Sequence, residues 1–179
     1  MESSGTRDSY AIPIIMAIQK ENIELVIELL ENDNRTEKCI NGKNALHHSI
    51  YTHDIEIFKI ILNSKIFNIN DKDNNGMTAL HLAANLGCAN EDRTIKLKLL
   101  LDAGADITIR SNDNNTILHY AAMRNSLKSM QEIFNKINIL PVESRLELMQ
   151  VVNDDEKTAL DLSLNMDWIG DEHSLTWLN

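Results

Sequence analysis

The sequence predicts an all-α fold, a solenoid of stacked helix-turn-helix units joined by hairpin-like loops. Three observations predict it. The stretch Gly-Met-Thr-Ala-Leu-His-Leu-Ala-Ala, residues 76–84, has the order of a turn, an N-capping threonine and a short helix. A helix of about two turns is too short to be stable alone in water, so it requires packed neighbours. Similar stretches recur along the chain at nearly regular intervals.

The closest copies of this stretch lie at residues 41–50 and 113–122, and weaker copies lie at 12–18 and 157–163. The first apolar anchors of the five copies are Ile14, Leu46, Leu80, Leu118 and Leu160. Subtraction gives spacings of 32, 34, 38 and 42 residues between them. A period in the low thirties around a Thr-Pro-Leu-His-x-Ala core is typical of ankyrin repeats. The chain therefore resembles the ankyrin repeat family over nearly its whole length.

The first two repeats are predicted at residues 10–35 and 36–70. Pro13 falls in the first turn of a helix, where the missing N–H of proline is tolerated. Apolar residues at helical spacing then mark the second helix of repeat one. In repeat two Asn44 occupies the position of the capping threonine. Asparagine caps helices as well as threonine does, so the cap is expected to be kept. The second helix of repeat two is expected over residues 55–62.

Repeats three and four are predicted at residues 71–106 and 107–139. Repeat three carries a polar insert, residues 88–94, between its two helices. In solenoids such an insert adds a loop to one face and leaves the stack intact. Residues 95–107 are similar to the second helix of the family and its Gly-Ala-Asp turn. In repeat four Asn114 replaces a turn glycine, since asparagine accepts the left-handed conformation at low cost.

A connector is predicted at residues 140–152, where Leu146, Leu148 and Met149 suggest an extra helical segment. The last copy, residues 153–179, has no recognisable second helix and is interpreted as a truncated capping repeat. We therefore expect one ankyrin-repeat domain over residues 1–179, with about four and a half repeats.

Composition bounds the kinds of partner. The formal net charge is −10, which argues against binding nucleic acid or an anionic membrane, since both rely on Lys and Arg. No run approaches the eighteen or so apolar residues that span a bilayer, and residues 1–9 lack the order of a secretory signal. Cys39 and Cys88 lie in different repeats, and we expect free thiols. We expect a soluble, monomeric protein of the cytoplasm, or of the host-cell cytoplasm or nucleus if it is an effector.

The histidines raise the question of a metal site. His47, His81 and His119 occupy equivalent positions, but equivalent residues in stacked helices are about 8–10 Å apart, too far for one zinc ion. The resemblance implies instead that this histidine bonds backbone between neighbouring repeats. A rival of another class stays open, a metal-binding or catalytic protein using His47, His48, His53 and the 88–94 insert. Because no catalytic motif is recognisable, we expect no enzyme, no metal and no cofactor.

The resemblance also implies a concave binding face, formed by the hairpin tips and the exposed side of the first helices. Carried over by position, the partner-binding residues are Lys43, Tyr51, Thr52, Asn74, Asn75, Met77, Asn85, Leu86, Arg110, Asn112, Asn115, Met123 and Arg124. Tyr, Met and Arg in this set are informative because interfaces are enriched in them. Asn70 matches the family position that an asparaginyl hydroxylase modifies, although the acid usual two residues earlier is Asn68 here.

The sequence thus favours a non-enzymatic protein–protein interaction module. In its small size the chain is similar to ankyrin proteins that intracellular bacteria and large DNA viruses direct at host proteins. An alternative is an inhibitor of the IκB type that masks a transcription factor. From Pro141 onward nine acidic residues face only Arg145 and Lys157, and this acidic segment would favour a basic target.

Overall fold

The fold is a row of helix pairs, seen here in a computed structural model that describes residues 12–32, 40–86 and 91–164. The described ranges contain helices and loops but no strand, which confirms the predicted all-α class. The helices are α1 (Ile12–Gln19), α2 (Ile23–Asn32), α3 (Ala45–Ser49), α4 (Ile55–Ser64), α5 (Ala79–Asn85), α6 (Glu91–Asp102), α7 (Ile117–Met123), α8 (Leu127–Ile137), α9 (Val142–Gln150) and α10 (Ala159–Leu164).

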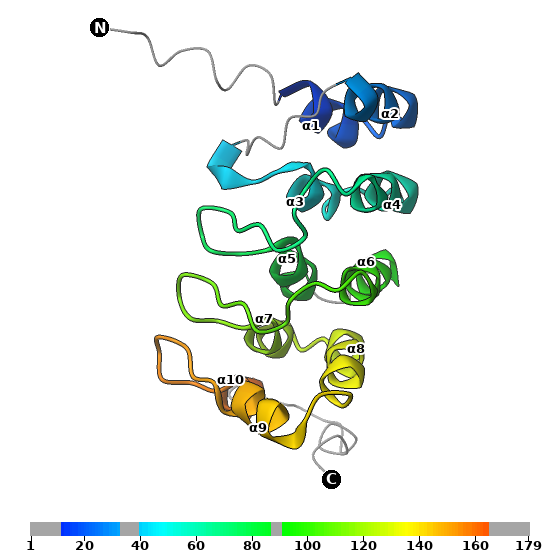
Figure 1. The fold of residues 1–179 in the computed structure, drawn as a ribbon. Helices are drawn as coiled ribbons and strands as arrows, with labels where there is room; N and C mark the ends of the chain where they lie inside the picture. The colour runs from blue at the N-terminus through cyan, green and yellow to red at the C-terminus, as the bar shows by residue number, and fades with distance from the viewer. Residues whose placement is uncertain (1–11, 33–39, 87–90, 165–179) are drawn as a thin grey trace, which may run out of the picture.

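The helices form two parallel rows, which Figure 1 shows side by side. The inner row contains the short helices α1, α3, α5, α7 and α10, and the outer row contains α2, α4, α6 and α8. Each inner helix packs on its neighbours in that row, and α1, α3, α5 and α7 also pack on the outer helix that follows each of them. The loops between repeats project on the side away from the outer row. This arrangement is the predicted solenoid.

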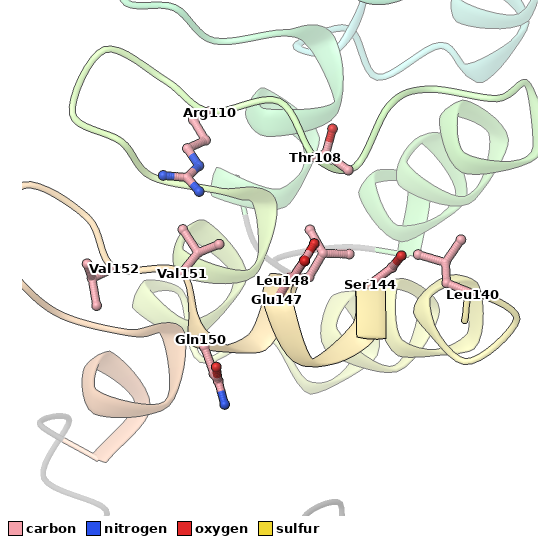
Figure 2. Close-up of a pocket in the computed structure, with 9 residues that line it drawn as sticks. All are labelled: Thr108, Arg110, Leu140, Ser144, Glu147, Leu148, Gln150, Val151 and Val152. Carbon is pink, nitrogen blue, oxygen red and sulfur yellow. The ribbon is translucent and has the colours of Figure 1, made fainter. Parts of the chain in front are cut away.

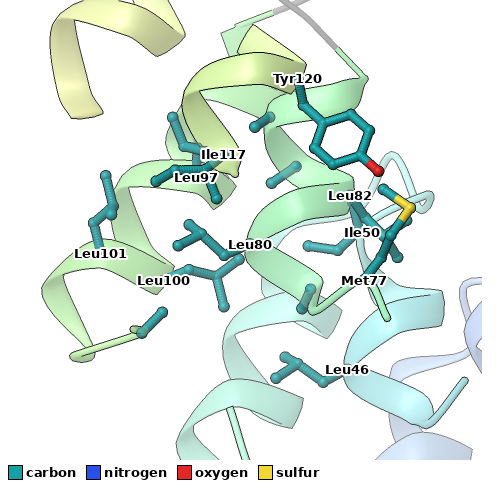
Figure 3. Packing of buried hydrophobic residues seen from close by; sticks show 14 of the residues in the cluster. Leu46, Ile50, Met77, Leu80, Leu82, Leu97, Leu100, Leu101, Ile117 and Tyr120 are labelled. Carbon is teal, nitrogen blue, oxygen red and sulfur yellow. The ribbon is translucent and has the colours of Figure 1, made fainter. Parts of the chain in front are cut away.

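The core runs continuously between the two rows. Figure 3 shows Leu80 of α5 beside Leu100 of α6, and Ile117 of α7 beside Leu97 of α6, all within one cluster. Leu80 has no exposed surface, and full burial of such a side chain contributes about 1.5–3 kcal/mol. Ala83 and Ala84 are also buried, and their small size lets the next inner helix approach closely. The short helices are therefore stabilised by their neighbours, as their length requires.

The recurring histidine connects each inner helix to the following loop. At His81 the backbone N–H of Thr78 donates to Nδ1 at 3.2 Å, so the proton of the neutral ring lies on Nε2. That Nε2 donates to the carbonyl oxygen of Ile109 in the next repeat at 3.0 Å. The same arrangement recurs in two other repeats, with Asn44, His47 and Met77 and with Thr116, His119 and Lys157. The predicted bond between repeats is confirmed.

Burial keeps these rings neutral. Burial lowers the pKa of His81 from 6.5 to about 4, against the opposing effect of its bond to the Ile109 carbonyl. Burial likewise lowers the pKa of His47 and of His119. Each ring can therefore accept at Nδ1 and donate at Nε2 at neutral pH, which is what the bond between repeats needs.

The loops between repeats bond to one another edge to edge. The N–H of Asn74 donates to the carbonyl of Asn41 at 2.9 Å, and the N–H of Asn112 donates to the carbonyl of Asn75 at 2.9 Å. Asn114 has a φ of 56°, the left-handed conformation predicted for it. The loop tips are thereby held in one ordered series beside the inner helices.

The structure corrects the predicted start of one helix and confirms another helix in the connector. The predicted insert at residues 88–94 is too long, because α6 begins at Glu91 and residues 91–94 form its first turn. The remaining insert residues, and both cysteines, lie outside the described residues. The extra helical segment expected in the connector is confirmed as α9, although of its residues with described burial only Leu148 is buried.

A buried lysine joins repeats two and three, which sequence patterns did not reveal. Lys96 is 1% exposed, and its Nζ donates to the carbonyls of Ser49 at 2.9 Å, Ile50 at 3.2 Å and Thr52 at 2.6 Å. These carbonyls follow the C-terminal end of α3, where a helix leaves acceptors without partners and a partial negative charge. The Nζ also lies 5.6 Å from the ring centroid of Phe58. Lys96 therefore caps α3 from the next repeat.

Candidate protein-binding surface

The end of α3 presents the predicted binding residues of repeat two. Tyr51 is 48% exposed, and the Nζ of Lys43 lies 3.4 Å from its hydroxyl and 5.2 Å from its ring centroid. An exposed aromatic ring thus lies next to a positive charge at the surface. Thr52 is half-buried and its hydroxyl donates to the carbonyl of Ser49 at 3.0 Å, so part of its role is structural.

In repeat three the predicted residues divide between the loop tip and the end of α5. Asn74 and Asn75 are exposed at the tip, where their backbone atoms bond to the adjacent loops. Asn85 and Leu86 are half-buried at the other end of α5. The Oδ1 of Asn85 accepts from Nε of Arg124 at 2.9 Å, which joins the surfaces of repeats three and four.

In repeat four Arg110, Asn112 and Arg124 are exposed and Met123 is half-buried. Asn112 donates from its side chain to the carbonyl of Asn74 at 2.8 Å. The exposed residues therefore belong to the same bonded series of loops and inner helices as those of repeats two and three. The structure brings these residues onto one run of adjacent repeats.

Two predicted residues are not at the surface. Met77 is 7% exposed and lies in the core beside Leu82 and Ile50 (Figure 3), and its carbonyl accepts the Nε2 of His47. Asn115 is 8% exposed, and its Oδ1 accepts from the Nδ2 of Asn153 at 3.0 Å. The placement of both side chains at the surface was wrong, because contacts between repeats cover them: Met77 packs beside Ile50 of repeat two, and Asn115 bonds Asn153 of the last copy. They leave the set of partner-contacting candidates.

Asn70 bridges two repeats. Its Oδ1 accepts from the backbone N–H of Asp106 at 2.9 Å, and its own N–H donates to Oδ1 of Asn68 at 2.9 Å. The backbone bond thus stays within the hairpin, whereas the side-chain bond reaches the end of the following repeat. The residue is half-buried, so its side chain is partly accessible.

A pocket of about 650 Å³, which sequence reasoning missed, lies between the loop of repeat four and α9 (Figure 2). The pocket is lined by Thr108, Arg110, Leu140, Ser144, Glu147, Leu148, Gln150, Val151 and Val152. Only Arg110 of these belongs to the predicted set. The predicted connector could have indicated this pocket, because a helix inserted between repeats can leave space beside the stack.

A second, smaller pocket of about 270 Å³ lies between repeats one and two and includes two of the three histidines raised by the sequence. His48 and His53 line it together with Glu21, and the Nε2 of His48 is buried without a hydrogen-bond partner among the described residues. Burial lowers the pKa of His48, with a contribution from Lys43. His47 is committed to its bond with Met77. Within the described ranges no three His, Cys, Asp or Glu side chains are grouped as metal ligands.

The described helices are also too short or too polar for any of them to cross a membrane. The described surface thus presents exposed polar, aromatic and basic side chains beside the two pockets just described. Such a surface can bind a protein.

Comparison with known proteins is consistent with this description. A family model described as ankyrin repeats, in three copies, matches residues 14–110. A putative ankyrin repeat protein of Acanthamoeba polyphaga mimivirus is 28% identical over 155 residues, covering 70% of this chain and 20% of that protein. The tyrosine-protein kinase Shark of Drosophila melanogaster is 34% identical over 120 residues, covering 65% of this chain and 12% of that protein.

A putative ankyrin repeat protein of Fowlpox virus is 34% identical over 98 residues, covering 54% of this chain and 21% of that protein. The chain therefore spans between about an eighth and a fifth of the length of these relatives.

Proposed function

Because this chain belongs to the ankyrin repeat family, whose repeats are generally protein–protein interaction modules, we propose that it binds a protein partner through its loop tips and inner helices. The binding surface contains the exposed and half-buried residues of the predicted set. These residues are Lys43, Tyr51, Thr52, Asn74, Asn75, Asn85, Leu86, Arg110, Asn112, Met123 and Arg124.

One observation carries the proposal. Tyr51 is 48% exposed, and the Nζ of Lys43 lies 3.4 Å from its hydroxyl. Neither the core nor the helix caps use it. Rigid, exposed aromatic side chains are the typical anchors of protein interfaces, because little conformational entropy is lost when they are covered.

The test is affinity capture from a eukaryotic cell lysate, read by mass spectrometry. The wild-type chain is compared with a triple variant, Tyr51→Ala, Met123→Ala and Arg124→Ala, which removes side chains at the ends of α3 and α7. We expect at least one protein to be retained by the wild type and lost by this variant. Circular dichroism confirms that the variant keeps its helices.

A matched control removes three exposed side chains from the outer row, with Asn63→Ala, Lys98→Ala and Gln131→Ala. This variant should capture the same proteins as the wild type. If the outer-row variant loses the partner and the inner-row variant keeps it, the interface lies on the opposite face. If wild type and both variants capture nothing specific, the proposed function is wrong.

A host-directed role is the second candidate, since two of the relatives described above are viral proteins. It predicts a partner that is found in eukaryotic lysates and absent from bacterial ones. Capture of the same partner from both kinds of lysate, through the same inner-row residues, would contradict it. The IκB-like alternative predicts that the captured partner is a transcription factor with a basic surface.

Asn70 remains a proposed hydroxylation site. Its half-buried side chain bonds the backbone of Asp106, so modification would be sensitive to local opening of that loop. Incubation with an asparaginyl hydroxylase should add the mass of one oxygen atom, and Asn70→Gln should abolish the gain. No gain on the wild-type chain removes the site.

A further inference from the structure

The pocket between the loop of repeat four and α9 is built by an element that interrupts the repeat pattern. Figure 2 shows Thr108 and Arg110 on the loop side and Ser144, Glu147 and Leu148 on the side of α9. The connector that contains α9 separates repeat four from the last copy. The pocket is therefore a feature of this chain's connector and lies outside the regular stack of repeats.

The pocket has an apolar floor and two charges on opposite sides. Leu140, Leu148 and Val151 are half-buried or buried, and Val152 is 47% exposed. Arg110 is exposed on the loop, and Glu147 is exposed on α9. Among the described residues neither of these side chains makes a hydrogen bond or an ion pair, and the two do not pair with each other. A volume of about 650 Å³ is ample for one large apolar side chain with part of its backbone.

An uncommitted arginine is informative in this chain. The protein carries 17 basic and 27 acidic residues, so its surface as a whole repels acidic partners. Arg110 offers a local exception, because its planar guanidinium can donate two parallel bonds to a carboxylate. Glu147, on the opposite side, offers an acceptor for a lysine or arginine. The apolar floor between them would cover a hydrophobic anchor.

We propose that this pocket binds a segment of the protein partner in which a bulky apolar residue lies between an acidic and a basic residue. The apolar side chain enters between the loop and α9, the acidic side chain bonds Arg110, and the basic side chain bonds Glu147. The inference rests on the proposed function, that the partner is a protein. It adds a second contact beside the inner-row surface and gives that contact a defined chemistry.

The test uses a displayed library of random 12-residue peptides, selected in parallel on the full-length wild-type chain and on Arg110→Glu. The wild type should enrich peptides with an acidic residue next to a large apolar one. Arg110→Glu should enrich peptides with a basic residue at the position where the wild type selects an acidic one. Lys98→Glu makes the same charge change on the exposed side of α6 and should enrich the same peptides as the wild type.

An enriched peptide is then synthesised and its dissociation constant is measured by fluorescence anisotropy. Arg110→Glu should weaken it at least tenfold, and replacing the acidic residue of the peptide by lysine should restore binding to that variant. Glu147→Lys should act in the same way on the basic residue. Ser144→Trp, which fills the pocket from α9, should remove binding while circular dichroism stays unchanged.

Several results would overturn the inference. Enriched peptides that tolerate Arg110→Glu, Glu147→Lys and Ser144→Trp but not the inner-row triple variant would place the contact on the inner row, so that the proposed function stands without the pocket. Failure of the wild type to enrich any peptide would reject the pocket, while lysate capture would still decide the proposed function. A change in mass by light scattering on Ser144→Trp would mean that a second copy of the chain occupies the pocket.

Discussion

The buried histidines make the stability of the stack depend on pH, and His81 gives the sharpest prediction. In the folded chain its pKa is about 4, whereas the unfolded chain has the ordinary value of 6.5. Between these two values the unfolded state binds more protons than the folded state, so stability falls as the pH falls. The contribution of neutral His81 is fully present above pH 6.5 and is lost progressively toward pH 4.

The magnitude follows from the two pKa values. The largest loss that His81 alone can cause is about 3 kcal/mol, since each pKa unit corresponds to about 1.4 kcal/mol. At pH 5.5, above the sequence pI of about 5.0, the loss relative to pH 7.5 is about 1.3 kcal/mol. His47 and His119, whose pKa values are lowered in the same direction, add to this loss in the wild type.

The assay is urea unfolding followed by circular dichroism at pH 7.5 and 5.5. His81→Gln is less stable than the wild type at both pH values because it lacks the Nδ1 acceptor for Thr78. Its loss between the two pH values should nevertheless be smaller than the wild-type loss by about 1.3 kcal/mol. Asn63→Ala, which removes an exposed side chain that does not titrate, should keep the wild-type loss. An equal loss in the wild type and His81→Gln would refute the reasoning.

Three further predictions concern stability measured by thermal or urea unfolding. Leu80→Asp buries a charge in the central core and should unfold the stack at 25 °C. Asn75→Asp, at an exposed loop tip, should change the free energy of unfolding by less than about 0.5 kcal/mol. Equal effects would mean that the buried and exposed positions are wrongly assigned. Gly76→Ala should destabilise the chain by more than Gly104→Ala. Both glycines have a positive φ, but only a Cβ at Gly76 would meet backbone of the adjacent loop, the nitrogen of Asn112 at 2.6 Å. The reverse order of stability would contradict this close approach. Lys96→Met should cost about 2 kcal/mol, since it removes the ammonium that donates to the carbonyls of Ser49, Ile50 and Thr52, of which the Ser49 carbonyl keeps only the Thr52 hydroxyl. A neutral or stabilising result would show that the cap contributes nothing net.

The stack itself could be predicted from the sequence because the signal is repeated. Thr78 caps α5 as its position predicts, and Asn44 caps α3 in the same way. Each repeat supplies an independent reading of the same pattern, so an error in one is corrected by the others. Single features without a repeat were less predictable, and the start of α6 at Glu91 is the clearest example.

The surface was predictable only in part. Tyr51 and Arg124 are exposed as their positions in the repeat indicate, but Met77 and Asn115 are covered by contacts between repeats. Position within one repeat cannot show what the next repeat covers. The pocket beside α9 was missed for the same reason, because its two sides lie about forty residues apart and no local pattern joins them.

The bonds from the three histidines to the following loops have a consequence for how such a chain can lengthen. His47 and His81 reach carbonyls 30 and 28 residues ahead, whereas His119 reaches one 38 residues ahead, and the three bonds are 3.0–3.1 Å long. The stack is thus aligned by contact, whatever the length of chain between contacts. We therefore expect the segment that contains α9 to tolerate exchange for a shorter loop or a foreign helix while the neighbouring repeats keep their alignment.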